Sequence, residues 1–110
     1  MRYKRRTKTE GRPLGTGLLG RAWRQRRRGE HRGAMLTLRE ACNRDSDSAR
    51  LWTLYAAACV RAGRREEATR ALKQALWIRQ RSHDDARAEI TRAILTRIEQ
   101  GEASLRVAVS

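Results

Sequence analysis

The feature that most constrains the fold of this chain is a pattern of small and aliphatic residues that occurs twice, 34 positions apart. Each copy has the order Gly-x4-Ala-x3-Leu-x2-Ala. The two copies consist of Gly29, Ala34, Leu38 and Ala41, and of Gly63, Ala68, Leu72 and Ala75. A repeat of this length is typical of stacked helical hairpins, in which neighbouring units bury apolar faces that no unit can bury alone. We therefore expect a small helical scaffold.

Composition alone argues in the opposite direction. The chain has 110 residues, so it forms at most one domain with a small core. Its net charge of +14 and its few large aliphatic residues are typical of disorder. Alanine is abundant, however, and alanine-rich helices pack closely without many large side chains. The periodic segments therefore favour an all-α fold, with no sheet outside the C-terminal tail.

The apolar periodicity predicts five helices. Four of them span about residues 16–28, 31–43, 48–61 and 83–100. The remaining helix, the fourth along the chain, begins after Gly63 and has Ile78 near its end. The chain then divides into a basic disordered arm, a helical domain and a tail. These three parts are residues 1–14, 15–100 and 101–110.

The apolar stripes of these helices define the expected core. The residues that we expect to be buried together are Trp52, Ala56, Cys59, Ala68, Leu72 and Ala75. The stripe of the last helix consists of Ile90, Ala93, Ile94 and Ile98. In the tail, Leu105, Val107 and Val109 alternate with other residues. The tail is either frayed or an extended segment that docks on a surface, and the sequence does not decide between the two.

Positive charge is concentrated at the front of the chain. Residues 1–33 contain 12 of the 26 lysines and arginines and only two acidic residues. Such a front attracts polyanions, namely nucleic acid, anionic lipid or an acidic protein surface. The residues that we assign to polyanion binding are Arg2, Lys4, Arg5, Arg6, Lys8, Arg12, Arg24 and Arg28.

Two tryptophans have alternative roles. Trp23 lies among the arginines of positions 21–28, so its ring can stack on a base while guanidinium groups bind phosphates. The simpler interpretation, which we favour, is a half-buried tryptophan on a helix whose other face is solvated. Trp77, near a helix end, either plugs an edge of the core or contacts a partner.

The spacing of the two cysteines does not indicate a redox or metal site. Cys42 and Cys59 are 17 positions apart, and each falls on an apolar stripe. We expect buried free thiols in a reduced cytoplasm, with a disulfide between two helices as the alternative.

No catalytic, metal or cofactor site is expected. His31 and His83 are the only histidines, and neither has ligand-forming residues at metal-site spacing. The glycine-rich residues 14–20 lack the strand and the lysine of a phosphate-binding loop. The longest apolar run, residues 54–60, is far shorter than the roughly 18 residues of a membrane span. A cytoplasmic protein without enzymatic activity is expected, unless the source is eukaryotic and the arginine-rich front is a transit peptide.

The repeated pattern resembles the tetratricopeptide repeat family over about residues 15–100. In the unit 49–82 the matching residues are Trp52, Ala56, Gly63, Ala68, Leu72 and Ala75. The preceding unit, 15–48, matches well only in its second helix, because Leu18 replaces the tryptophan and Arg21 stands where an apolar residue is usual. Residues 83–100 provide a first helix alone. The resemblance implies two antiparallel helix hairpins and a C-terminal capping helix.

In this family the first helix of each hairpin lines a concave groove that binds a peptide or a partner protein. Carried over by position, the groove residues are Thr16, Leu19, Trp23, Arg26, Arg27, Arg50, Thr53, Ala57, Val60, Arg61, Asp84, Arg87, Thr91, Ile94 and Leu95. This mixture of apolar and basic side chains suits an acidic or amphipathic partner segment. The lysine and asparagine arrangement by which some members hold a C-terminal carboxylate is absent, which argues against an adaptor for chaperone tails.

The sequence therefore favours an adaptor or scaffold that binds protein through its concave face. The alternative is a nucleic-acid-associated protein whose basic front contacts phosphates. Two and a half repeats are fewer than the three or so that stabilise such arrays, which leaves self-association or partner-assisted folding open.

Overall fold

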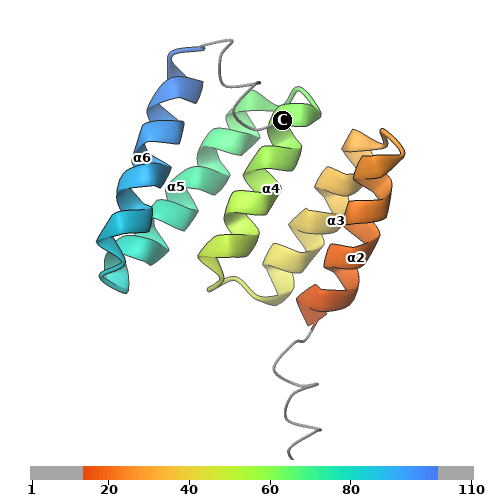
Figure 1. The fold of residues 1–110 in the computed structure, drawn as a ribbon, viewed down its shortest axis with the longest axis horizontal. Coiled ribbons are helices and arrows are strands. Elements are labelled where there is room, and N and C mark those ends of the chain that lie inside the picture. The colour runs from red at the N-terminus through yellow and green to blue at the C-terminus, as the bar shows by residue number, and fades with distance from the viewer. Residues whose placement is uncertain (1–13, 102–110) are drawn as a thin grey trace, which may run out of the picture.

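The computed structural model describes residues 14–101, and this segment is entirely helical apart from its turns (Figure 1). Its five helices are α2 (Leu14–Arg27), α3 (His31–Arg44), α4 (Ala49–Arg61), α5 (Arg65–Arg81) and α6 (Asp85–Glu99). The predicted all-α fold is confirmed, and for the four helices with predicted bounds each end lies within two residues of the observed one.

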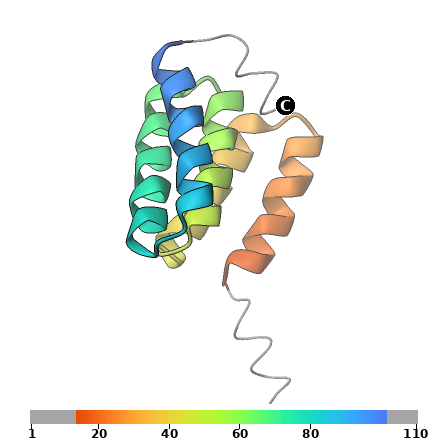
Figure 2. The ribbon, with the colours of Figure 1, turned by 60° about the vertical axis from the view of Figure 1, so that its left-hand side comes forward.

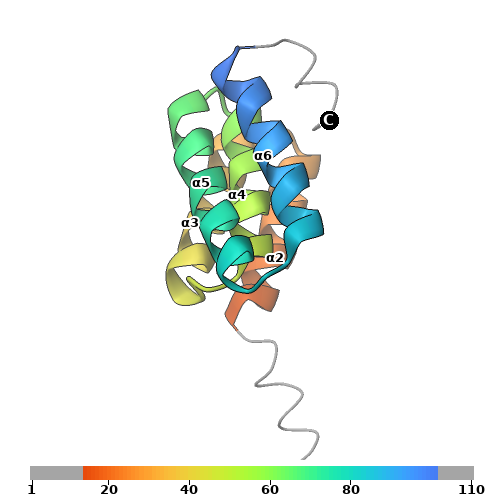
Figure 3. The ribbon, with the colours of Figure 1, turned by 90° about the vertical axis from the view of Figure 1, so that its left-hand side faces the viewer.

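The five helices follow one another in a zigzag. Each helix packs on the helices before and after it in the chain, and within residues 14–101 no other pair of helices comes into comparable contact. Seen from the end of the array, α3 and α5 lie on one side, α2 and α6 lie on the other, and α4 lies between them (Figure 3). This is the layout of a short helical-repeat array, in which chain neighbours bury each other's apolar faces.

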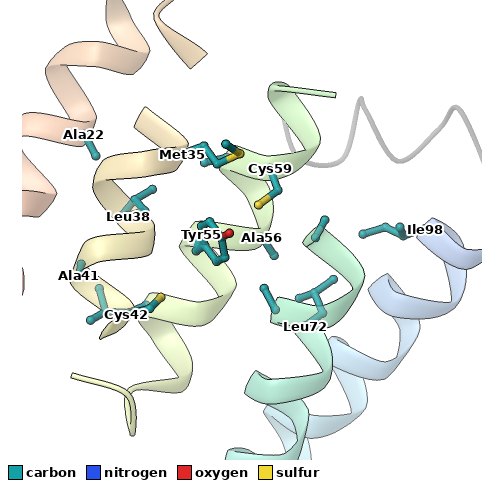
Figure 4. Close-up of a cluster of buried hydrophobic side chains, with 14 of the residues drawn as sticks. Ala22, Met35, Leu38, Ala41, Cys42, Tyr55, Ala56, Cys59, Leu72 and Ile98 are labelled. Carbon is teal, nitrogen blue, oxygen red and sulfur yellow. The ribbon is translucent and has the colours of Figure 1, made fainter. Parts of the chain in front are cut away.

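Small residues let the helices approach closely in the core (Figure 4). Ala41, Ala68 and Ala75 have no exposed surface, and Ala56 is 2% exposed. The largest fully buried side chains are Met35, Leu72, Thr91, Cys42 and Cys59. The core is therefore continuous from α2 to α6 although few of its side chains are large.

Trp52 was expected to be buried with this core, and that expectation is wrong. The side chain is only partly buried, because its indole Nε1 donates a hydrogen bond of 2.9 Å to the carbonyl oxygen of Ser46 in the α3–α4 loop. An indole N–H needs a partner, and here it finds one at the rim of the core.

One type of turn recurs along the array. A residue with positive φ follows the ends of α2, α4 and α5, namely Gly29 (80°), Gly63 (77°) and His83 (60°). In each case the backbone N–H of the residue after this turn residue donates a hydrogen bond to the carbonyl oxygen of the residue four positions before the turn residue. These bonds are Glu30 N to Gln25 O, Arg64 N to Cys59 O and Asp84 N to Arg79 O, all of 2.8 Å. The α5–α6 connection therefore has the same geometry as the two hairpin turns, which satisfies the last carbonyls of each helix.

This shared turn sets the orientation of α6. Ala34, Ala68 and Ala88 each lie five residues after a turn residue, and all three are buried. The helix α6 thus has the register of the second helix of a hairpin. That register places Thr91 and Leu95 in the core.

The stripe predicted for α6 is therefore wrong in part. Ile90 is 60% exposed and Ala93 is exposed, whereas Ile98 is buried as expected and Ile94 is partly buried. The sequence interpretation treated α6 as the first helix of a third unit, and the turn at His83 rotates a different face of the helix toward α5.

Candidate functional site

A groove runs between α2 and α4 and has α3 as its floor. Its cavity volume is about 90 Å³. The lining residues are Leu19, Ala22, Trp23 and Arg26 of α2, Ala34 and Leu38 of α3, and Leu54, Ala57, Ala58 and Arg61 of α4. Clefts that enclose small molecules are typically about 300–1,000 Å³. The groove is therefore suited to individual side chains of a segment that crosses it.

The groove exists because the backbones of α2 and α4 stay apart. Both helices pack on α3, and Figure 2 shows α2 standing apart from the helices that follow α3. Ala34 of α3 and Ala58 of α4 project only small side chains, which leaves room in the groove for a ligand side chain. Leucines from three helices and the ring of Trp23 supply most of the apolar lining, so the groove can desolvate aliphatic side chains.

Two arginines stand at the rim of this apolar surface. Arg26 comes from α2 and Arg61 from α4, and no acidic residue of the described segment lines the groove. Burial lowers the pKa of Arg61, and the positive charge of Arg26 lowers it further. The Arg26 guanidinium also lies over the ring of Trp23, 5.6 Å from its centroid. A carboxylate placed between the two guanidinium groups would relieve their repulsion.

The structure brings together five of the fifteen residues that were predicted to line the groove. Leu19, Trp23, Arg26, Ala57 and Arg61 all line the groove. The sequence did not assign Ala22, Ala34, Leu38, Leu54 and Ala58 to it. Ala34 and Leu38 belong to the repeated pattern of small and aliphatic residues, and the separation of α2 from α4 opens these positions to a groove.

The other predicted groove residues lie elsewhere. Arg27 and Arg50 are exposed and do not line the groove. Thr53 is partly buried and its hydroxyl donates to the carbonyl oxygen of Ala49, 2.8 Å away. Arg87 forms an ion pair of 3.1 Å with Asp84 at the start of α6, and this contact holds the pKa of Asp84 below its usual value. The side chain of Thr16 lies outside the described residues.

Thr91 was assigned to the groove, and the structure corrects this assignment. The residue is 1% exposed. Its hydroxyl accepts a hydrogen bond of 2.8 Å from Arg79 Nη1 and donates one of 2.7 Å to the carbonyl oxygen of Arg87. A side chain held in this way between α5 and α6 cannot contact a partner, because the α5–α6 turn has rotated it into the core.

The outer surface of α2 is strongly basic. Arg21, Arg24, Arg27 and Arg28 are exposed at this helix and its end, and α2 contains no acidic residue. Within residues 14–101 none of these four arginines forms an ion pair. The predicted polyanion-binding residues Arg2, Lys4, Arg5, Arg6, Lys8 and Arg12 lie outside the described part of the chain.

The remaining candidates offer little chemistry. Cys42 and Cys59 are buried free thiols, as expected. The Nδ1 atom of His31 is buried without a hydrogen-bond partner among the described residues. Trp77 is 51% exposed and lies beneath the guanidinium of Arg81, 4.3 Å from the ring centroid. The exposed ring is compatible with a partner contact.

Comparisons with known proteins leave the family open. Neither the family models, nor the curated proteins, nor the solved structures include a match to this chain. Between residues 14 and 101, no helix has the length and apolar character that crossing a bilayer requires.

Proposed function

We propose that the protein is a non-enzymatic adaptor that binds an acidic, amphipathic segment of a partner protein in the groove between α2 and α4. The observation that carries the proposal is the combination of an apolar lining with two cationic residues, Arg26 and Arg61, in a groove that no acidic residue between positions 14 and 101 lines. The 34-residue repeat and the recurrent turn further support an array related to the tetratricopeptide repeats.

The groove can bind both the aliphatic and the acidic side chains of such a segment. An aliphatic side chain that enters between Leu19 and Leu54 removes apolar surface from water on both sides. A neighbouring carboxylate then meets two guanidinium groups, each of which can form charge-assisted hydrogen bonds. A basic segment would instead add a third positive charge at the same place, so charge selects the partner.

The groove is tested with a fluorescently labelled peptide of leucine, aspartate and glutamate, and with a matched peptide in which lysine replaces the acids. Anisotropy titrations should show binding of the acidic peptide alone. Reversing both rim charges in the Arg26→Glu, Arg61→Glu variant should weaken binding by about tenfold or more, since two favourable charge contacts become repulsive.

Arg50→Glu provides the matched control, because Arg50 is an exposed arginine of α4 outside the groove. It should leave the affinity close to that of the wild type. Circular dichroism should show the same helix content in all three proteins. Equal affinity of the rim variant and the wild type would place the binding site elsewhere.

We propose association with nucleic acid as a second function, supported by the surface of α2. Four exposed arginines of this surface have no carboxylate partner in the described segment and lie within five residues of Trp23, whose ring is 57% exposed. Guanidinium groups beside an exposed aromatic ring suit phosphates and unstacked bases. Six further basic residues lie between positions 1 and 12.

A further inference from the structure

The face of α6 that points away from α5 has no partner within residues 14–101. We call this surface, formed by Ala86, Glu89, Ile90, Ala93 and Arg97, the outer face of α6; all five residues are exposed. Ile90 is 60% exposed, the highest value among the exposed large apolar side chains of the described segment. The helix stands at the end of the array, and among the described helices it packs on α5 alone (Figure 1). An aliphatic side chain between two alanines on an open helix face is a typical contact surface for another helix.

Charge distinguishes α6 from the rest of the described array. Its three arginines, Arg87, Arg92 and Arg97, are balanced by Asp85, Glu89 and Glu99. Each of the other four helices has more basic than acidic side chains. Two copies of so basic a protein repel each other at most surfaces, and they repel least where the local net charge is zero.

The charges of the outer face are also self-complementary. Glu89 and Arg97 lie four residues before and four residues after Ala93. When two α6 helices cross antiparallel with Ala93 at the crossing, a two-fold axis places Glu89 of each copy opposite Arg97 of the other. In the described part of the chain Arg97 forms no ion pair, and Glu89 contacts only Arg92 of its own helix, at 2.8 Å.

We propose that a second copy of the chain docks on the outer face of α6 and forms an antiparallel α6–α6 dimer. The small side chain of Ala93 allows close approach at the crossing, and Ile90 of each copy packs beside it. This inference goes beyond the adaptor function, because the outer face contains no residue of the groove between α2 and α4. One helix face from each copy makes a small interface, so the dissociation constant should be on the order of micromolar.

Sedimentation equilibrium of the full chain tests the dimer. The wild type should shift from monomer to dimer as its concentration rises through the micromolar range. Glu89→Arg and Arg97→Glu should each raise the dissociation constant about tenfold or more, because each homodimer then has two like-charge contacts in place of two ion pairs.

Mixing the two single variants is the decisive step. In the heterodimer each changed residue faces an opposite charge, so the mixture should dimerise about as tightly as the wild type. Arg70→Glu, an exposed charge reversal on α5, should not affect association. Ile90→Glu should abolish the dimer while circular dichroism still shows a helical monomer.

Three results would overturn the proposal. A wild type that stays monomeric at high concentration would leave the outer face to residues 102–110 or to another protein. Failure of the mixed variants to associate would exclude the antiparallel pairing. A dimer that survives Ile90→Glu would use a different surface.

Discussion

Cys42 and Cys59 contribute buried side chains to the core of this alanine-rich protein. Both thiols are fully buried, one on α3 and one on α4. Burial raises the pKa of Cys42 to about 12 and that of Cys59 to about 11. The folded protein therefore keeps both groups neutral well above physiological pH, which fits a packing role and not a nucleophilic one.

The raised pKa values of the two thiols predict that the protein loses stability in alkaline solution. In the unfolded chain they ionise near pH 9, the value typical of free cysteine, whereas in the folded protein they stay protonated up to about 11 and 12. Between these values the unfolded state binds fewer protons, so the free energy of unfolding falls as pH rises, by up to about 1.4 kcal/mol per pH unit for each thiol. Urea unfolding between pH 7.5 and 10.5 measures this slope.

The variant that carries Cys42→Ala and Cys59→Ala is the matched comparison. It should be less stable at neutral pH but lose stability less steeply above pH 9, with Tyr55 contributing the remaining slope because burial raises its pKa too. Parallel slopes in the two proteins would show that the thiols are not the groups that titrate.

At the scale of the elements, the turns determine how the helices face one another. The same positive-φ position follows α2, α4 and α5, and Gly101 repeats it after α6 with a φ of 69°. Glycine occupies this position at each of these four helix ends except that of α5, where His83 adopts the left-handed conformation. A side chain with a Cβ is strained there, so the α5–α6 connection is the least favourable of these turns.

This difference predicts opposite effects for two substitutions. Gly63→Ala should destabilise the protein by about 1 kcal/mol, since an added Cβ meets no atom within 4 Å and only the backbone conformation is penalised. His83→Gly should stabilise it by roughly 0.5–1 kcal/mol. Gly17→Ala is the control, because it lies in α2 with equal space around it and should be neutral or stabilising. Chemical denaturation gives all three values, and a destabilising His83→Gly would contradict the role assigned to the turn.

At the scale of the whole molecule, the net charge of +14 is distributed unevenly. The first described helix is purely basic and the last is neutral. The α2 end of the array is therefore suited to an anionic partner, and the α6 end is suited to a second copy of the chain. The groove between α2 and α4 lies at the basic end, where an acidic partner segment is attracted most strongly.

The salt dependence of polyanion binding tests the basic end. Removing one arginine that neutralises a phosphate should reduce the slope of log affinity against log salt by about 0.9 on duplex DNA. Arg24→Gln with Arg28→Gln should therefore flatten the slope by up to about 1.8. The matched pair Arg65→Gln with Arg70→Gln, two exposed arginines of α5, should change it little. Anisotropy of labelled DNA between 50 and 200 mM salt measures both slopes, and identical slopes would exclude α2 as the contact.

The sequence by itself determined the helices and the close-packed alanines. The repeated glycines and the helical spacing of apolar residues are local signals, and Ala56, Ala68 and Ala75 are buried as that spacing predicts. Arg26 and Arg61 at the rim of the groove were also expected, because the resemblance to the tetratricopeptide repeats implies groove positions there.

The tertiary structure alone decided which face of α6 is buried and where the groove opens. The turn at His83 has no glycine to mark it in the sequence, so the rotation that buries Thr91 and exposes Ile90 was not predictable from residue type. Leu38 and Leu54 line the groove only because α2 and α4 both pack on α3 while their backbones stay apart. Helix formation depends on neighbours within a few residues, whereas the orientation of a helix face depends on turn geometry and on contacts between segments far apart in the chain.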